Sequence, residues 1–365
     1  MVTDQLARSY LKNYIFLVEP TLQDFLSAKL KEALKISQSS KENLGISEQM
    51  IKTYQSFIAG GKKLRGSLIF LGFDLVHKRT NKDILFASIA IEILHAALLM
   101  HDDIMDQDPL RRGMPTIHKR YEEIHRKNFN KGSTSHYGLS MGIDLGDDGI
   151  FMAIEVLATA NLPEKNKNQA LTTFARLLQQ TAFGQAMDVT YELLPTATEE
   201  DVLRIHTYKT AFYTIAGPLA IGATLAGAPE NVLSAINDYG KAVGVAFQLR
   251  DDELGLYSSE DKLGKPIGSD VREGKNTVLR IKAIELSKGR DRNFLLQAYG
   301  NEELSAYDVK RVQSITKDSG ALAYSQQLSR RLVEKGKRAI PEITSNKKYQ
   351  DLLTSFAELM ITRDS

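Results

Sequence analysis

Residues 84–113 read ILFASIAIEILHAALLMHDDIMDQDPLRRG, and this stretch decides the fold. Its most apolar part, from Ile84 to Met100, is hydrophobic nearly all round, which is typical of a helix in the centre of a helical protein. The same part is shorter than the roughly 20 residues that cross a bilayer, and it carries Glu92 and His95. We therefore expect a buried core helix here and no transmembrane segment in the chain.

The rest of the chain continues the helical pattern. Apolar residues recur three and four positions apart over long windows, whereas alternating runs of β-branched and aromatic residues are scarce. We expect helices over 150–160, 169–191, 199–226, 231–257, 278–298, 306–337 and 348–361, packing helices within residues 1–50, and loops over 108–115, 127–142 and 258–276. No tract rich in proline or serine divides the sequence, so we predict an all-α fold with residues 1–365 in a single domain.

The composition excludes several classes of protein. A chain of 365 residues with 42% hydrophobic content is typical of a globular protein rather than a disordered one. A net charge of only +2 does not supply the field that a nucleic-acid binder needs, so no nucleic-acid partner is expected. The absence of cysteine excludes a disulfide framework and a cysteine nucleophile and fits a reducing compartment. The N-terminus does not resemble a signal peptide, and we expect a cytoplasmic location.

Acidic residues end the central helix. Asp102 and Asp106 are four positions apart, so their side chains face the same way and lie about 6 Å apart on a helix. Such carboxylates repel one another unless a cation lies between them, and an acidic last turn also opposes the helix dipole. Hard oxygen ligands suit Mg²⁺, which commonly binds one or two carboxylates together with substrate phosphates. Two cations follow at once, Arg111 and Arg112.

A second acidic pair, Asp251 and Asp252, follows another apolar helical run. The loop LGKPIGSDVREGK comes next, at 263–275, and its glycines and basic residues suit it to cover anionic oxygens. A further basic cluster, GGKKLR at 60–65, places two of its cations on one helical face. Each feature alone is an ordinary solvated surface. Together, two carboxylate pairs and three cationic clusters match a site that holds two diphosphates through metal bridges and charge-assisted hydrogen bonds.

In this order the motifs resemble the trans-isoprenyl diphosphate synthase family, which includes farnesyl and geranylgeranyl diphosphate synthases. The matching motifs are G-G-K-x-x-R at 60–65, D-D-x-x-D at 102–106 followed by R-R-G at 111–113, K-T at 209–210, F-Q-x-x-D-D at 247–252, G-K at 264–265 and a final lysine, Lys275. His95 and the pattern G-Q-x-x-D at 184–188 also match. The second acid motif departs from some members, because Gly255 stands where they carry a third aspartate.

The resemblance implies a single-domain helical bundle around a deep central cavity, with the two acid motifs facing each other across its mouth. It also implies three Mg²⁺ ions per site. The implied metal-binding residues are Asp102, Asp103, Asp106, Asp251, Asp252 and Asp270. The implied contacts to the leaving diphosphate are Lys209, Lys265 and Arg111, and those to isopentenyl diphosphate are Lys62, Arg65, His95 and Arg112. Thr210 and Gln248 would lie beside the reacting carbons, and Gln185, Asp188 and Lys275 would also bind substrate.

The implied reaction is the head-to-tail condensation of isopentenyl diphosphate with an allylic diphosphate. It needs no side-chain nucleophile, because metal-assisted departure of pyrophosphate leaves a cation that the isopentenyl double bond attacks. Product length in the family depends on the bulk of the cavity floor, and here Ala97, Leu98 and Leu94 occupy the relevant positions without an aromatic ring. We therefore expect geranylgeranyl diphosphate (C20), with farnesyl diphosphate (C15) or a longer polyprenyl diphosphate as the alternative.

Two other functions compete with this interpretation. A class I terpene cyclase shares the first acid motif but binds one diphosphate, so it has no use for the cations Lys62, Arg65 and Arg112. A catalytically silent partner subunit would not need both acid motifs. Members of the family usually form dimers, so we expect a homodimer. Four histidines match no ligand spacing and are expected to be surface or satisfied polar residues: His118, His125, His136 and His206.

Overall fold

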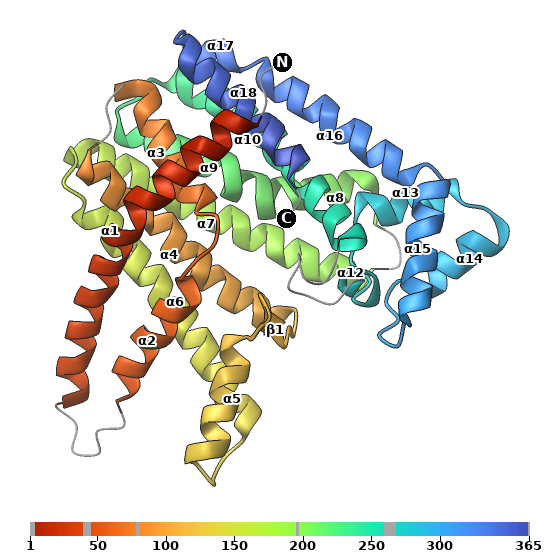
Figure 1. Ribbon diagram of the computed structural model, residues 1–365, viewed down its shortest axis with the longest axis horizontal. Coiled ribbons are helices and arrows are strands. Elements are labelled where there is room, and N and C mark those ends of the chain that lie inside the picture. Colours follow the sequence, from red (N-terminus) through yellow and green to blue (C-terminus); the bar gives the residue numbers. More distant parts are fainter. Residues whose placement is uncertain (1–3, 39–44, 78–80, 195–196, 259–267, 364–365) are drawn as a thin grey trace. The chain divides into compact units, whose positions relative to one another are not determined.

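The structure, a computed structural model, describes residues 4–38, 45–77, 81–194, 197–258 and 268–363 (Figure 1). Helices make up nearly all of these residues, which confirms the all-α prediction. The chain divides into two compact units. Unit 1 comprises residues 1–8, 172–223 and 227–365, and unit 2 comprises residues 9–171 and 224–226. The single-domain organisation stays a prediction.

Unit 2 is built around the central helix that the sequence predicts. Its elements are α1 (Gln5–Gln38, from Ser9 onward), α2 (Ile46–Ile58), α3 (Leu64–His77), α4 (Lys82–Met105), β1 (Leu110–Arg111), β2 (Met114–Pro115), α5 (Ile117–Asn128), α6 (Thr134–Thr159) and the start of α7 (Glu164–Glu192). Helix α4 packs against α2, α3, α5 and, most extensively, α6. The expected loop at 108–115 contains a two-residue antiparallel hairpin, β1 and β2.

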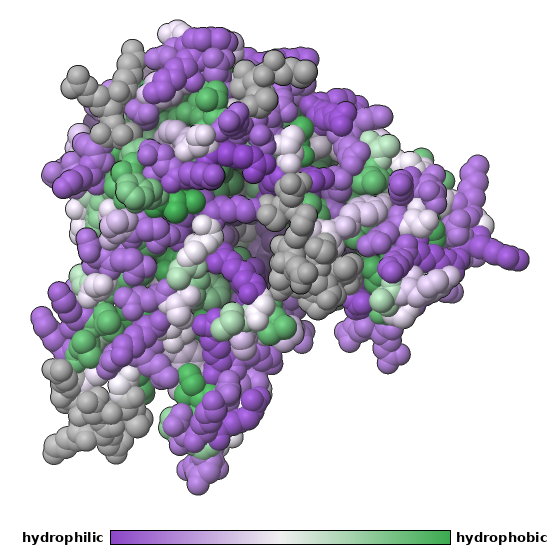
Figure 2. Space-filling view, in the orientation of Figure 1, coloured by the Kyte–Doolittle hydropathy of each residue, from purple (hydrophilic) through white to green (hydrophobic). Residues whose placement is uncertain are grey.

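Helix α4 is stabilised by a capped first turn and by burial of its apolar side chains. The side chain of Asn81 accepts hydrogen bonds from the backbone amides of Asp83 and Ile84, which caps the first turn. Among the described residues, α4 is the one helix with the length and composition of a membrane span, but 67% of its apolar window is buried inside the fold. Hydrophilic side chains cover most of the face in Figure 2, as burial of the apolar helix faces requires.

Unit 1 is organised around a long helix, α10 (Glu230–Tyr257). Its other elements are most of α7, α8 (Glu199–Ile205), the π-helix η1 (His206–Ala216), most of α9 (Gly217–Leu225), α12 (Ser269–Arg272), α13 (Val278–Leu286), α14 (Gly289–Ala298), α15 (Ala306–Asp318), α16 (Ala321–Lys337), α17 (Ile340–Ile343) and α18 (Lys347–Thr362). Helix α10 packs chiefly against η1 and α16, and also against α17 and α18.

The structure differs from the expected single helix over 199–226, because its middle part is a π-helix. A π-helix is wider than an α-helix. A neighbouring helix can therefore pack closely against it where the neighbour carries glycine, which has no side chain. A Cβ atom at Gly240 would lie 2.3 Å from the Cα of Ala216, and one at Gly184 would lie 2.3 Å from the backbone nitrogen of Lys209. Glycines on α10 and α7 therefore create the room in which η1 packs.

Three other sequence expectations are corrected. The segments 278–298 and 306–337 each form two helices, and the second break lies at Gly320, whose φ is 88°. The expectation of a loop over 127–142 is wrong from Thr134 onward, where α6 begins. Glycine in that segment permits close packing rather than a turn, since a Cβ atom at Gly138 would lie 2.5 Å from the carbonyl oxygen of His118 on α5.

Gly184→Ala tests the packing of η1. Alanine in place of glycine normally stabilises a helix interior by about 1 kcal/mol. Here the added methyl group would meet the backbone of Lys209, so we expect a loss of roughly 1–3 kcal/mol in the free energy of unfolding, measured by urea titration. Ala186→Ser, at an exposed position of the same helix, is the control and should change stability by less than about 0.5 kcal/mol. A more stable Gly184→Ala variant would contradict the packing.

Candidate active site

The first acid motif ends α4 with one buried and two partly exposed aspartates. Asp103 is fully buried, whereas Asp102 and Asp106 are partly exposed. The Nε of Arg111 donates to Oδ1 of Asp103, and Nη2 of the same guanidinium lies 3.5 Å from Oδ2 of Asp102. Burial raises the pKa of Asp103 to about 6, although the charge and hydrogen bond of Arg111 act in the opposite direction. Asp103 therefore anchors Arg111, and Asp102 and Asp106 are the more accessible carboxylates.

The hairpin after α4 returns Arg111 to the acid motif. Arg111 pairs with Met114 in the two-residue antiparallel ladder, and positive φ values of 52° at Arg112 and 73° at Gly113 make the turn. The hydroxyl of Thr116, which is fully buried, donates to the carbonyl oxygen of Asp108 at 2.8 Å and ties the two ends of the loop together. The sequence predicted a loop here, and its turn geometry explains how the arginines reach back to α4.

The basic cluster at 60–65 lies against the second arginine of this hairpin. Gly60, Gly61 and Lys63 have φ values of 74°, 82° and 46°, so the turn lies in the left-handed region that glycine adopts readily. A Cβ atom at Gly61 would lie 3.3 Å from Nη2 of Arg112. Lys63 is buried and its Nζ donates to the carbonyl oxygen of Ile58 at 2.7 Å, which leaves Lys62 as the exposed lysine of the cluster.

His95, one turn before the end of the apolar part of α4, marks where these cations converge. Burial and the charges of Arg65, Arg111, Arg112 and Lys63 hold the pKa of His95 well below its usual value. The structure thus brings Arg65, His95 and Arg112 together, three of the four residues that the resemblance assigns to isopentenyl diphosphate, and Lys62 lies in the adjoining turn. We call Lys62, Arg65, His95 and Arg112 the cationic cradle.

Glu92 supports this cradle and has no place in the motif-based analysis. Its side chain is 6% exposed, and Oε1 accepts a hydrogen bond of 2.7 Å from the backbone amide of Gly66. Burial raises the pKa of Glu92, while that hydrogen bond and the charges of Lys63 and Arg65 lower it. An acid in the middle of the most apolar helix was the available signal, because a buried carboxylate requires partners.

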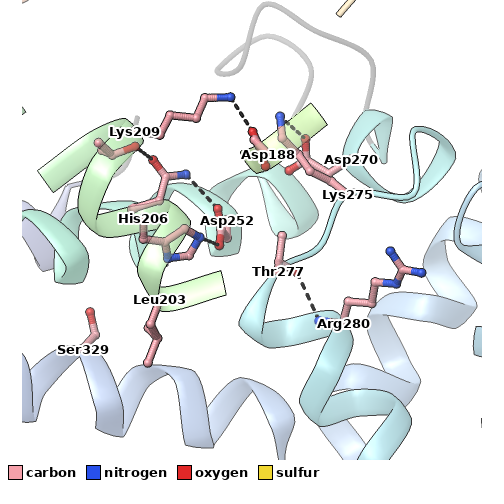
Figure 3. Close-up of polar contacts among 12 residues, drawn as sticks. Asp188, Leu203, His206, Lys209, Asp252, Asp270, Lys275, Thr277, Arg280 and Ser329 are labelled. Atoms are coloured by element: carbon pink, nitrogen blue, oxygen red, sulfur yellow. Dashed lines mark hydrogen bonds and ion pairs between the residues drawn. The ribbon is translucent and has the colours of Figure 1, made fainter. Parts of the chain in front are cut away.

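In unit 1, two lysines lie beside carboxylates near η1 (Figure 3). Nζ of Lys209 is 2.5 Å from Oδ2 of Asp188, and Nζ of Lys275 is 4.0 Å from Oδ1 of Asp270. Burial raises the pKa of Asp188, but the charges of Lys209 and Lys275 outweigh it and leave the pKa below its ordinary value. Gln185 is partly exposed one turn before Asp188 on α7. The sequence-predicted residues Asp188, Lys209, Asp270 and Lys275 are therefore neighbours.

Thr210, Gln248 and Asp252 form a hydrogen-bonded chain between η1 and α10. The hydroxyl of Thr210 donates to Oε1 of Gln248 at 2.8 Å, and Nε2 of Gln248 donates to Oδ1 of Asp252 at 2.8 Å. Nε2 of His206 lies 3.3 Å from Oδ2 of the same carboxylate (Figure 3). The expectation that His206 is a surface or satisfied polar residue is not met, because the ring is buried and its Nδ1 has no hydrogen bond to the described residues.

Asp251 pairs with a residue far along the chain. Its Oδ1 contacts Nη2 of Arg363, whose guanidinium also stacks 3.7 Å from the ring centre of Phe247. Arg250 donates from Nε and Nη2 to the carbonyl oxygen of Arg363 at 3.1 and 3.0 Å. A cation from the segment after α18 thus neutralises the exposed aspartate of the second acid motif.

The absence of a side chain at Gly255 is explained by the carboxylate of Asp270, which occupies the adjacent space. A Cβ atom at Gly255 would lie 2.5 Å from Oδ2 of Asp270, so the space beside this position already holds a carboxylate from α12. Asp270 therefore lies beside the position at which other members carry the third aspartate. Lys265 and Gly264 lie outside the described residues.

The chain-length positions lie in the core of unit 2. Leu94 and Ala97 are fully buried, and Leu98 is partly exposed. A Cβ atom at Gly149 of α6 would lie 2.8 Å from Cβ of Ala97 and 2.5 Å from the hydroxyl of Tyr54. Gly149 therefore allows α6 to pack closely against α4 at Ala97.

The comparison with known proteins identifies this arrangement of motifs. The sequence pattern of the polyprenyl synthetase family matches residues 47–316, well over half of the chain. The chain belongs to the polyprenyl synthetase family. The match confirms the resemblance that the motifs predicted.

Individual relatives agree with this assignment. A geranylgeranyl diphosphate synthase of Sulfolobus acidocaldarius is 35% identical over 295 residues, which cover 80% of this chain and 84% of the relative. A geranylfarnesyl diphosphate synthase of Natronomonas pharaonis is 29% identical over 320 residues, which cover 84% and 87%. The crystal structure of a geranylgeranyl pyrophosphate synthase from Corynebacterium glutamicum, complexed with isoprenyl diphosphate and magnesium, superposes with a TM-score of 0.89 at 28% identity and covers 97% of this chain and 99% of that one.

The contrast between Asp103 and Asp102 is testable through stability. Asp103→Ala leaves Arg111 without its buried partner, so the free energy of unfolding should fall by about 3 kcal/mol. Asp102→Ala removes a weaker contact from a side chain that is 27% exposed, and should cost less than about 1 kcal/mol. The free energy of unfolding of both variants should be measured by urea titration at the same pH. An equal decrease in the two variants would show that Asp103 is not the acid that anchors Arg111.

Proposed function

We propose that this chain catalyses the Mg²⁺-dependent head-to-tail condensation of isopentenyl diphosphate with an allylic diphosphate, and that its main product is geranylgeranyl diphosphate. As a polyprenyl synthetase the chain is a prenyltransferase. The names of its relatives support C20 as the product length, although a geranylfarnesyl synthase is among them. Farnesyl diphosphate and longer polyprenyl diphosphates are the alternatives that product analysis distinguishes.

One observation within unit 2 carries the proposal. Arg65 and Arg112 of the cationic cradle lie near its His95, while Asp102 and Asp106 end the same helix about two turns further on. Carboxylates recruit a diphosphate only through a metal ion, whereas guanidinium groups bind one directly through charge-assisted hydrogen bonds. The arrangement therefore suits two diphosphates held in two different ways. A terpene cyclase, which binds one diphosphate, would have no use for the cradle, and a silent subunit would need neither.

The residues present fit Mg²⁺. Asp102, Asp106 and Asp251 offer hard carboxylate oxygens, and all three are partly exposed. Within the described part of the chain, no three histidine, cysteine or acidic side chains converge on one point. This suits a cation that takes one or two carboxylates from protein and completes its shell with diphosphate oxygens and water. A metal ion at Asp251 would compete with the Arg363 guanidinium for that carboxylate.

The reaction requires a broken C–O bond and a new C–C bond. The electron pair of the allylic C–O bond leaves with pyrophosphate, the isopentenyl double bond attacks the allylic cation, and loss of one proton restores an alkene that is one C5 unit longer. Bound Mg²⁺ would supply charge neutralisation of the departing pyrophosphate. Lys209, held by Asp188, would place a further cation at the leaving group, together with Arg111 and Lys275. The cradle would hold isopentenyl diphosphate.

Assembly and location remain predictions. Helix α6 exposes Leu139, Ile143, Phe151 and Ile154, which share one helical face, and an apolar face of this kind supports the expected homodimer. The number of three Mg²⁺ ions and the cytoplasmic location rest on the sequence alone.

Activity tests the proposal directly. The purified protein, incubated with Mg²⁺, isopentenyl diphosphate and dimethylallyl, geranyl or farnesyl diphosphate, should yield a C20 alcohol after dephosphorylation, identified by chromatography. Asp102→Ala and Asp251→Ala should each lower turnover by at least about 100-fold, because each removes charge stabilisation of the leaving group. Lys347→Gln, an exposed change on α18, is the control. Turnover near that of the wild type in either aspartate variant would refute the metal assignment.

Ala97→Phe tests the assignment of product length. If Ala97 lies beside the growing prenyl tail, the added ring should shorten the main product from C20 to C15. The same ring would crowd Gly149 and Tyr54, so we also expect a stability loss of about 1–3 kcal/mol. Product analysis below the melting temperature separates the two effects. If the variant folds and still makes a C20 product, Ala97 does not lie at the cavity floor that limits the length of the prenyl chain.

A further inference from the structure

His206 is a buried histidine that belongs to none of the sequence motifs. Its side chain is 5% exposed, and it lies at the first residue of η1, where the helix changes from α to π geometry. Nδ1 is buried and has no hydrogen-bond partner among the described residues. Nε2 lies 3.3 Å from Oδ2 of Asp252. Through Nε2 this ring contacts the second acid motif (Figure 3).

Asp252 has a different polar neighbour at each oxygen. Oδ1 accepts a hydrogen bond from Nε2 of Gln248 at 2.8 Å, and Oδ2, which has no hydrogen bond to the described residues, lies 3.3 Å from Nε2 of His206. The side chain is 7% exposed, whereas Asp251 beside it is 38% exposed and pairs with Arg363. A buried carboxylate needs partners for both oxygens. The two aspartates of the motif are therefore unlike: Asp251 is accessible to a cation, and Asp252 is engaged with the protein.

The carboxylate of Asp252 determines which atoms donate and which accept in the hydrogen bonds that link Thr210, Gln248 and Asp252. An ionised carboxylate only accepts hydrogen bonds, so the amide nitrogen of Gln248 faces Asp252 and its Oε1 faces Thr210. Oε1 in turn only accepts, so the hydroxyl proton of Thr210 is committed to Gln248. The lone pairs of the Thr210 oxygen then remain for a positive charge. Oxygen dipoles fixed in advance stabilise a cation that develops during a reaction.

We propose that His206 is a positioning residue for prenyl transfer. By holding the carboxylate of Asp252 it fixes the amide of Gln248, and through it the hydroxyl oxygen of Thr210, for the allylic cation. This inference rests on the proposed function, since it assigns these residues to the reacting carbons. His206 does not contact substrate itself. Its effect passes through Asp252 and Gln248.

The variants His206→Leu and His206→Gln test the proposal. Leucine removes the ring nitrogens, so kcat should fall by about 10- to 100-fold while the KM for isopentenyl diphosphate stays within about threefold. Glutamine restores a nitrogen donor near the position of Nε2, so kcat should return to within about threefold of wild type. The loss should persist at saturating Mg²⁺. A leucine variant with wild-type kcat, or one rescued by excess Mg²⁺, would overturn the proposal.

A double-mutant cycle checks that His206 acts through Gln248. If the two residues belong to one network, His206→Leu should reduce kcat further by less than about twofold in a Gln248→Ala background. Losses that multiply would show that His206 acts independently. The same cycle on the free energy of unfolding should show coupling whether or not the protein turns over. An inactive wild-type protein would refute the proposed function, whereas an active protein without coupling would refute this inference alone.

Ser329→Ala provides a matched control. Ser329 is also buried, and its hydroxyl donates to the backbone carbonyl of Ala246 on α10 at 3.1 Å, away from Asp252. The variant removes one hydrogen bond to the same helix and should leave kcat within about twofold of wild type. If it lowers kcat as far as His206→Leu does, general destabilisation of α10 explains both losses, and the proposal fails.

Discussion

Adjacent carboxylates on a buried helix require partners, and both acid motifs are organised by this constraint. At the end of α4 the helix dipole adds a further negative charge to that of the aspartates. At α4 the partner is Arg111, which the hairpin turns back onto Asp103. At α10 Arg363 contacts Asp251, and Nε2 of His206 lies beside Asp252. In each motif one carboxylate is buried against protein groups and another is partly exposed.

The same constraint accounts for the buried charges of unit 2. Glu92 holds the backbone amide of Gly66 and lies near Lys63 and Arg65, so a single acid in an apolar helix supports the basic turn. Arginine suits such a site, because its guanidinium binds a diphosphate with two parallel hydrogen bonds while its stem packs on apolar neighbours. Binding and stability thus use the same cations, and the fold need not leave a charge unpaired in the core.

The sequence was sufficient for what depends on local spacing. Helical periodicity and the order of the motifs gave the all-α fold and the family, and the convergence of cations near His95 followed from matched motifs. Contacts between distant segments were not predictable. No spacing rule links Asp251 to Arg363, or Gly255 to a carboxylate on α12. The π-helix was also missed, because three-and-four periodicity does not distinguish an α-helix from a short stretch of wider turns.

The π geometry of η1 limits how this segment can change in length. His206, Lys209 and Thr210 reach α10 and α7 from wide turns that glycines on those helices accommodate. Deletion of one residue between 206 and 216 would let the segment rewind as an α-helix and rotate one end against the other. Either the polar side chains would leave Asp188 and Gln248, or the apolar residues before α9 would leave the core. The number of residues in this segment is therefore constrained by packing, in addition to the identity of its polar side chains.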